Sequence, residues 1–477
     1  MTGSGRPMKL KPLTALLCAA PALFLLSCVT TTRNNLFVKA DEAVAAQNYK
    51  AAAAELDGPR SSTYYRDKDQ VLRYLDTGML YQLAGSSQES VQRFEEAERL
   101  IEDNYTKSVT NAVTSFIVND YQLDYFGEPY EDVYLNVFKA IDYIRMNRFD
   151  DSFVEIRRVD EKLNLLEDKY GKLASSMNGS SDAKGVVKAG KTKFHNSALA
   201  QYIGLLLYRA DNRPSDAAIN GDKIRQAFAS QSGLFDFPCP NVDPLLQPTD
   251  KARLDVIGFS GRSPEKRAST LRIITEKDLL LIEAEKENDK GVMVPTTLAP
   301  IPFPVGGEYR FKAMLPDMYK RPSKVAKIVV LVDGFAVGQL ALIEKMDSIA
   351  LETFELHRTP LYFKTVIRAV TKGIVTAKLK EKANSEAAKQ GGLLSVLSFA
   401  GGVAADLAVD ASEQADLRCD RYFPGQARVG EFLIEPGQHD VEVDYYAAGG
   451  GLLYRENFPR KNYAKDGLNV LASCSLQ

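Results

Sequence analysis

Metal-binding or nucleophilic chemistry would show first at the histidines and cysteines. The three histidines, His195, His357 and His439, are far apart in the sequence, and the five cysteines form no C-x-x-C pair. Zinc sites usually show such ligands at short, regular spacings. The G-x-S-x-G, G-x-x-x-x-G-K-[ST] and G-x-G-x-x-G motifs are also absent. The sequence therefore predicts no catalytic residue, no metal site and no cofactor, and we expect that the protein is not an enzyme.

One pair of residues does match a catalytic spacing. Ser263 and Lys266 form an S-x-x-K pattern, which on a helix puts a serine nucleophile one turn from a lysine base. The pair lies in GFSGRSPEKR, whose glycine and proline residues are typical of a turn rather than of a buried helix start. The accompanying SDN and KTG motifs are absent. We therefore interpret this stretch as a structural turn.

Cys28 lies at the end of an apolar segment near the N-terminus. The stretch LTALLCAAPALFLL follows a short basic start, and its length suits a signal peptide better than a membrane-spanning helix. It ends in Leu25-Leu26-Ser27-Cys28, which resembles a bacterial lipobox. The resemblance implies cleavage between Ser27 and Cys28 and lipidation of the Cys28 thiol.

The lipobox divides the N-terminal region into two parts. Residues 1–27 are then a signal peptide, and residues 28–34 are a lipid-anchored tether. Several acyl chains on one residue give stable anchoring, which a single chain does not. Val29 rather than aspartate follows the cysteine, which by resemblance favours the outer membrane facing the periplasm. The alternative is an ordinary secretory signal in which Cys28 has no role.

Composition limits the other partners. The chain has 477 residues, enough for two or more domains, and 60 basic residues against 62 acidic ones give a net charge of −2. Removal of the basic signal peptide makes the mature chain more acidic, which argues against a nucleic-acid partner. Three cysteines remain beyond Cys28. Cys419 and Cys474 both lie in the C-terminal part and form a candidate disulfide, and three free buried thiols are the alternative.

The first half of the mature chain reads as pairs of helices. In residues 68–103, large and small residues alternate at the spacing of a tetratricopeptide-like unit, in which small residues allow close helix approach and large ones fill the remaining space. These packing residues are Tyr74, Gly78, Tyr81, Ser90, Phe94 and Ala97. Further pairs are expected over 40–56, 132–170 and 195–228. The turns are expected at AGSS, Gln47-Asn48, Asn147-Arg148 and DNRPSD. Residues 35–232 are therefore predicted to form a helical repeat domain.

The character of the sequence changes near residue 233, after which strand-like segments dominate. A long helix is expected from Thr359 and Pro360 to about residue 390. The sequence therefore predicts an α+β fold, in which an α/β C-terminal domain over 233–477 follows the helical repeats. Within the long helix Lys364, Arg368 and Lys372 recur every fourth residue. They form either a solvated face or a contact for an anionic surface. The apolar segment 392–409 reads as a buried helix hairpin rather than a membrane insertion.

A family resemblance is carried by several stretches together: the lipobox, YFGEPYEDVYLNVFKAIDYI, VEIRR, IGFSGRSPEKR and ADLR with FLIEPGQHDVEV. They resemble a poorly characterised family of bacterial tetratricopeptide-like lipoproteins. The resemblance implies a lipid-anchored envelope protein that serves as a protein-binding scaffold or assembly factor. Its expected partners are the membrane, through the lipid on Cys28, and another envelope protein. The alternative is an envelope enzyme or a structural lipoprotein that acts on or binds the cell-wall polymer peptidoglycan.

Overall fold

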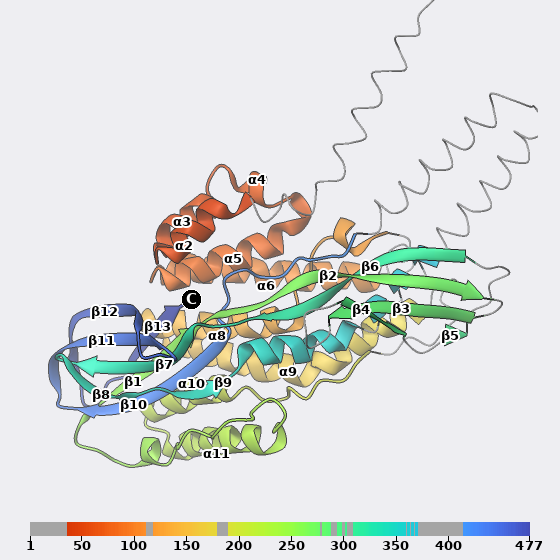
Figure 1. Ribbon diagram of the computed structural model, residues 1–477. Helices are drawn as coiled ribbons and strands as arrows, with labels where there is room; N and C mark the ends of the chain where they lie inside the picture. Colours follow the sequence, from red (N-terminus) through yellow and green to blue (C-terminus); the bar gives the residue numbers. More distant parts are fainter. Residues whose placement is uncertain are drawn as a thin grey trace, which may run out of the picture.

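The computed structural model describes residues 36–110, 118–178, 189–276, 279–287, 293–297, 301–302, 309–370 apart from 359, 363 and 367, and 414–477. The fold is α+β, as the sequence predicted, with helices in the N-terminal half and sheets in the C-terminal half (Figure 1). The α-helices are α2 (Val38–Ala45), α3 (Tyr49–Asp57), α4 (Ser61–Tyr64), α5 (Gln70–Leu83), α6 (Ser87–Thr110), α8 (Pro129–Arg145), α9 (Phe149–Asn178), α10 (Ala198–Ala210) and α11 (Pro214–Ser230). Short 3-10 helices are η3 (Asp67–Asp69), η4 (Asp120–Gln122) and η5 (Pro244–Leu246).

The helices pack in successive pairs: α2 with α3, α5 with α6, α8 with α9, and α10 with α11. Each turn between partners contains one residue in the left-handed region, where Gln47, Gly85, Asn147 and Asn212 have φ of 59°, 73°, 58° and 56°. Glycine and asparagine adopt this conformation more readily than most residues. All four turns fall at the breaks expected from the sequence. Helix α8 lies at the centre, with every residue from Pro129 to Ile144 buried.

Three sheets follow the helices. The first has the order β13-β1-β10-β9, the second β12-β11-β7-β8, and the third β4-β3-β2-β6 with β5 beside β3. Their strands are β1 (Ala252–Ser260), β2 (Arg262–Glu276), β3 (Leu279–Glu287), β4 (Met293–Thr297), β5 (Ile301–Pro302), β6 (Tyr309–Arg321), β7 (Val325–Val332), β8 (Phe335–Gln339), β9 (Ala341–Glu344), β10 (Gln426–Ile434), β11 (Gly437–Ala447), β12 (Leu452–Tyr463) and β13 (Asn469–Ser475).

Strand β1 shows how the layers are built, because its side chains alternate between two buried environments. Leu254 and Val256 belong to the apolar cluster between the first and second sheets. Ile257 and Phe259 instead join the cluster formed by the helices, and the Phe259 ring meets the ring of Phe138 on α8 at 5.6 Å. The first sheet is therefore covered by helices on one face and by the second sheet on the other.

The predicted domains 35–232 and 233–477 share one hydrophobic core. The helical cluster includes Tyr422, Phe423, Ala427 and Val429 from the C-terminal part of the chain. The Phe423 ring lies 5.0 Å from that of Phe138 and 6.2 Å from that of Phe94. The boundary near residue 233 thus marks a change of secondary structure but does not separate two cores.

The predicted long helix starts earlier than expected. Helical residues begin at 346 rather than at Thr359 and are described as far as 370, and its expected continuation to 390 lies outside the described residues. Met346, Ile349 and Phe354 are buried at its start. Within the part of the chain that the structure describes, no helix is both long and apolar enough to cross a membrane. The apolar segment 392–409 is outside that part.

Candidate functional site

Residues 414–423, here called the docked segment, run without regular secondary structure between helices α5 and α6 and strand β2 (Figure 1). Arg418 is its most heavily bonded side chain and is 2 % exposed. Its guanidinium lies 3.2 Å from Asp69 Oδ1 and 2.6 Å from Asp416 Oδ2. It also donates to the main-chain oxygens of Asp120 at 2.8 Å and Leu123 at 2.9 Å. Arg418 therefore fastens the segment to η3, η4 and the loop after it.

The backbone of the docked segment is held by side chains of the helices. The main-chain N–H of Asp420 donates to Glu131 Oε1 at 2.6 Å, and that of Arg421 donates to Asp76 Oδ1 at 2.8 Å. Asn119 Nδ2 donates to the main-chain oxygen of Gln414 at 2.9 Å. These hydrogen bonds satisfy backbone groups that would otherwise be buried without partners.

The acceptor carboxyls lie in an unusual electrostatic environment. Burial raises the pKa of Asp76 to about 7, in spite of the hydrogen bond from the Arg421 N–H. Burial, followed by the nearby Asp420 charge, raises the pKa of Glu131 well above its usual range. Burial also raises the pKa of Asp420. Each of these carboxyls accepts a tyrosine hydroxyl: Tyr65 donates to Asp76 and Tyr125 to Glu131, both at 2.8 Å, and Tyr130 donates to Asp420.

The S-x-x-K residues are part of this region, but they do not form a nucleophile and base. Ser263 and Lys266 lie in strand β2 rather than in the predicted turn or in a helix. Ser263 Oγ donates to Asp420 at 2.9 Å, whereas Lys266 Nζ is paired with Glu128 Oε1. Burial alone would lower the pKa of Lys266, but Glu128 raises it above the usual value. A protonated lysine cannot accept a proton from the serine.

His357 completes the buried charge cluster around Glu128. Its Nε2 is 3.4 Å from Glu128 Oε2, and its ring stacks on Tyr170 at 5.5 Å. Burial lowers the pKa of His357, although Glu128 opposes this effect. In the described part of the chain, no group of three or more His, Cys, Asp or Glu side chains is placed to bind a metal ion. His357 and Glu128 thus have a structural role that the sequence did not predict.

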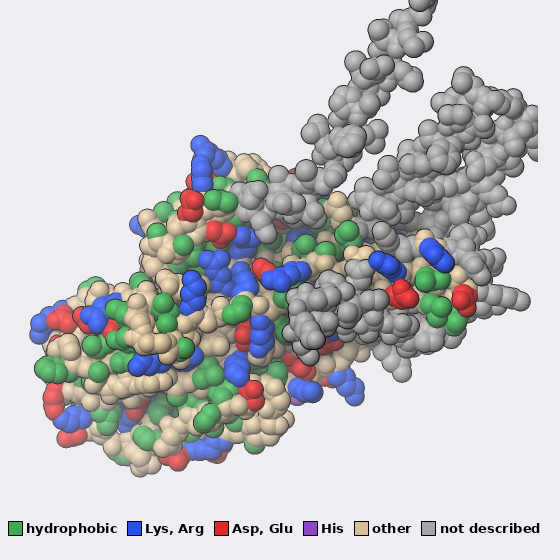
Figure 2. Space-filling view, viewed as in Figure 1, with side chains coloured by type: hydrophobic (Ala, Val, Ile, Leu, Met, Phe, Trp, Pro, Cys, Tyr) green, Lys and Arg blue, Asp and Glu red, His purple; other side chains and the backbone are tan. Residues whose placement is uncertain are grey.

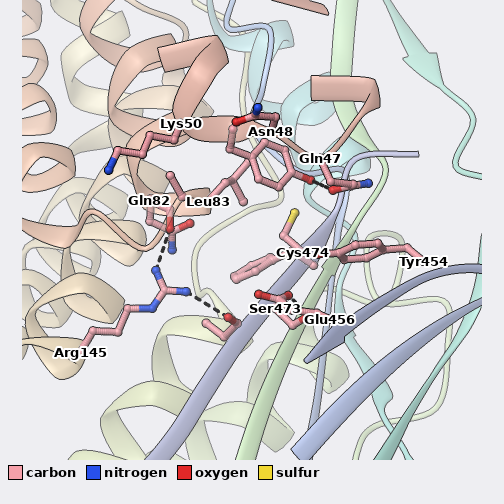
Figure 3. A pocket seen from close by; sticks show the side chains of 14 residues that line it. Gln47, Asn48, Lys50, Gln82, Leu83, Arg145, Tyr454, Glu456, Ser473 and Cys474 are labelled. Atoms are coloured by element: carbon pink, nitrogen blue, oxygen red, sulfur yellow. Dashed lines mark hydrogen bonds between the residues drawn. The ribbon is translucent and has the colours of Figure 1, made fainter. Parts of the chain in front are cut away.

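A second polar region is a cavity of about 240 Å³ between α3, the end of α5 and strand β13 (Figure 3). Arg145 crosses it and donates to the main-chain oxygens of Gln82 at 2.8 Å and Ala472 at 3.0 Å. Ser473 Oγ donates to Glu456 Oε2 at 2.5 Å. Burial, followed by the Glu456 charge, raises the pKa of the Cys474 thiol well above its usual range. The thiol stays protonated at neutral pH and is a poor nucleophile.

The predicted Cys419–Cys474 disulfide is wrong: both thiols are free and buried. Cys474 faces the cavity just described, whereas Cys419 contacts the main-chain oxygen of Pro264 beside the docked segment. The two residues belong to different regions of the C-terminal part. Cys239 is also free but exposed. Of the alternative, three free buried thiols, all three are free, but only Cys419 and Cys474 are buried.

The predicted basic stripe does not form an anionic contact surface. Lys364 and Arg368 are buried, at 2 % and 4 % exposure. Lys364 Nζ lies 2.5 Å from Asp120 Oδ1, and Arg368 Nη1 lies 3.8 Å from Asp120 Oδ2. Their four-residue spacing places both on one helix face, but that face is turned toward η4 rather than toward solvent. Lys372 lies outside the described residues.

The six predicted packing residues lie on α5 and α6. Gly78, Ser90, Phe94 and Ala97 are buried between the helices. Ser90 Oγ donates to the main-chain oxygen of Gly78 at 2.9 Å, and a Cβ atom on Gly78 would lie 2.9 Å from the Phe94 ring. Tyr74 and Tyr81 are only partly buried at the edge of this core.

The N-terminal predictions, including the cleavage site at Ser27 and lipidation of Cys28, lie outside the described residues. Comparison of the chain with known protein families, with curated proteins and with solved structures finds no match. No relative therefore assigns a function to the docked segment or to the helices that hold it.

Proposed function

We propose that the protein is a lipid-anchored bacterial envelope protein that serves as a protein-binding scaffold or assembly factor through its helix pairs. The exposed apolar side chains of the helices carry the proposal, and the docked segment supports it as an example of how these helices hold an extended chain. Asp76, Glu131 and Asn119 hold an extended polypeptide by hydrogen bonds to its backbone. Backbone recognition of this kind suits extended chains of many sequences, and pockets for side chains such as Arg418 add selectivity.

The inner face of the helices is filled by residues 414–423, so we place the partner on the helix surface that stays exposed. The most exposed large apolar side chains of the helices are Leu165 on α9, at 61 %, and Ile219 on α11, at 53 %. Leu433 on β10 is exposed to a similar degree, at 54 %, but lies outside the helical half. It therefore offers a matched control.

In-cell cross-linking followed by denaturing purification tests the proposal. We expect one dominant cross-linked protein, reduced in a Cys28→Ala variant because the anchor brings the two proteins together. The Leu165→Glu variant should lose this product, and Leu433→Glu should keep it. Adducts of sugar polymer, or no specific product in any variant, would contradict the scaffold proposal and favour a wall-binding role.

A further inference from the structure

A cavity of about 650 Å³ opens beside the docked segment, and neither the helix packing nor the scaffold proposal explains it. The helical side of its wall includes the aromatic residues Phe37, Tyr64 and Tyr121. The opposite side is formed by the start of β2, the end of β6 and the docked segment itself. In Figure 2 a group of Lys and Arg side chains lies in the middle of the visible face, between the helices and the sheets.

Five arginines line this cavity, and three of them come from three different parts of the chain: Arg262 on β2, Arg321 on β6 and Arg421 on the docked segment. Arg262 and Arg421 share one carboxylate. Asp41 Oδ2 is 2.8 Å from Arg421 Nη2, and Asp41 Oδ1 is 3.6 Å from Arg262 Nη1. Arg321 donates to neutral oxygens, the main-chain oxygens of Ser263 at 2.5 Å and Arg421 at 3.2 Å.

The other charges of the lining are already matched. Lys266 is paired with Glu128, Arg418 with Asp69 and Asp416, and Arg267 with Glu265. The remaining carboxyl, Asp420, accepts hydrogen bonds from Tyr130 and Ser263. In the described part of the chain, the ion pairs of these three guanidinium groups are both made with Asp41, while Asp420 lies near Arg321 and Asp76 near Arg421. Burial lowers the pKa of Arg262, and the nearby charge of Arg321 lowers it further.

The arrangement suits a tetrahedral oxyanion. Planar guanidinium groups bind phosphate through paired N–H donors, and arginine is the residue used most often for this contact. Among the described residues, the buried Nε of Arg421 has no hydrogen-bond partner. Tyr422 donates its hydroxyl to Asp41 Oδ1 at 3.3 Å. The Asp41 carboxylate thus occupies the position in which a ligand oxygen would accept hydrogen bonds from two arginines and a tyrosine.

We propose that this cavity binds a phosphate group, held by Arg262, Arg321 and Arg421, with the aromatic wall contacting the group that the phosphate carries. A phospholipid headgroup and a soluble phosphate ester share this chemistry. The first source rests on the proposed lipid anchor, because an extended chain from Cys28 to Asp41 spans at most about 45 Å. The anchor would therefore keep the cavity close to a membrane surface.

Calorimetric titration of the purified full chain with glycerol 3-phosphate tests the site itself. We expect saturable binding that weakens about tenfold in Arg321→Gln, because a charge-assisted hydrogen bond is lost. Arg99→Gln is the matched control, since Arg99 is exposed on α6 and paired with Glu96 and Asp103. It should bind as the wild type does.

A second variant gives a change of the opposite sign. Asp41→Asn removes the carboxylate that competes with the ligand, so affinity should increase by about threefold or more. This test decides the matter if Arg321→Gln fails to fold. Absence of saturable binding in the wild type, equal weakening by Arg99→Gln, or unchanged or weaker binding by Asp41→Asn would each overturn the proposal.

Vesicles of phosphatidylglycerol distinguish the two sources. A Cys28→Ala chain that sediments with these vesicles, and a Cys28→Ala/Arg321→Gln chain that does not, would assign the site to a lipid headgroup. Binding of glycerol 3-phosphate without a vesicle difference between these two chains would assign it to soluble phosphate esters. Failure of the lipid anchor is measured separately, as missing incorporation of labelled palmitate at Cys28, and does not alter the titration.

Discussion

The α5–α6 pair and the docked segment are both buried against the same helices, but different interactions hold them. Between α5 and α6 the contact is apolar: Gly78 lets the ring of Phe94 approach, and Phe94 packs on Phe138 at 6.1 Å. Around the docked segment the contact is polar, with Arg418, Asp76 and Glu131 buried and hydrogen-bonded. Only Tyr422 and Phe423, at its end, join the apolar core.

Because different interactions hold the two regions, mutation and pH should affect the stability of each in a different way. An apolar interface loses stability roughly in proportion to the atoms removed, and it is insensitive to pH. A buried polar interface depends on each partner, because removal of one group leaves another desolvated and unpaired. The two regions should therefore separate in mutational and pH experiments.

The largest effect is expected from Arg418→Ala. The variant leaves Asp416 without its ion-pair partner, whereas Asp69 keeps its pair with Arg66. A loss of about 3–5 kcal/mol in the free energy of unfolding follows from breaking a buried pair of this kind. Urea denaturation followed by circular dichroism measures this loss. Arg99→Ala, at an exposed position, should change stability by less than about 0.5 kcal/mol. Equal losses in the two variants would show that the docked segment is not held by Arg418.

Phe94→Ala tests the apolar interface. The ring is fully buried, so its removal should lower the free energy of unfolding by about 3–5 kcal/mol. Tyr81→Ala should cost less, about 1–2 kcal/mol, because the ring is only partly buried. Part of this loss is the hydrogen bond from the Tyr81 hydroxyl to Asp57 at 3.2 Å. Thermal unfolding that is unchanged in both variants would contradict the helix-pair assignment.

Gly78→Ala tests how closely α5 and α6 pack, because close packing reverses the usual effect of this substitution on stability. In an exposed helix, alanine in place of glycine is stabilising by up to about 1 kcal/mol. Here the added Cβ would lie 2.9 Å from the Phe94 ring, so we expect a destabilisation of about 1–3 kcal/mol. Higher stability of the variant in urea denaturation would mean that the two helices are less closely packed than the structure shows.

The smallest expected effect is the part of the pH dependence that Asp76 contributes in the polar region. Asp76 has a folded pKa of about 7, above its unfolded value of about 3.9. Its contribution to stability is complete below pH 4 and is lost as the pH rises toward 7. Asp76→Asn should therefore reduce the stability difference between pH 5 and pH 8, by about 1 kcal/mol or more. Parallel pH profiles of wild type and variant would contradict this prediction.

Other buried carboxyls do not account for the expected difference between the pH profiles of the wild type and Asp76→Asn. The pKa of Asp255 and that of Glu344 are each raised to about 7, mainly by burial, and both groups remain in the variant. The pKa of Asp416 is lowered to about 2, because Arg418 outweighs the effect of burial. Its contribution is lost only as the pH falls below about 4, so it is constant between pH 5 and pH 8.

Sequence patterns predicted the apolar region well because its determinants are local. Three of the four turns contain a residue type that tolerates positive φ, namely Gly85, Asn147 and Asn212, whereas Gln47 adopts this conformation without such a preference. The packing of Gly78 against Phe94 follows from helical spacing within one pair. The strand segments were visible in the same way, through runs of apolar residues that alternate between two faces.

The polar region could not be predicted, because its partners are hundreds of residues apart. Nothing in the spacing of Lys364 and Arg368 says that Asp120 lies opposite them. One local signal was available: Asp76 lies four residues after Leu72 and three before Met79, on the buried face of α5. A charged residue at such a position is rare unless it has a buried partner. The sequence did not identify that partner.

The shared core has a consequence for biosynthesis. Phe94 and Phe138 complete their packing only with Phe423, and β1 pairs in parallel with β13, more than two hundred residues later. A nascent chain that has reached residue 400 lacks both. The helices can therefore complete their core only after the C-terminal part of the chain has been synthesised, and contacts between residues so distant in sequence form slowly. An export channel that accepts only unfolded chains would meet a polypeptide whose core is still incomplete.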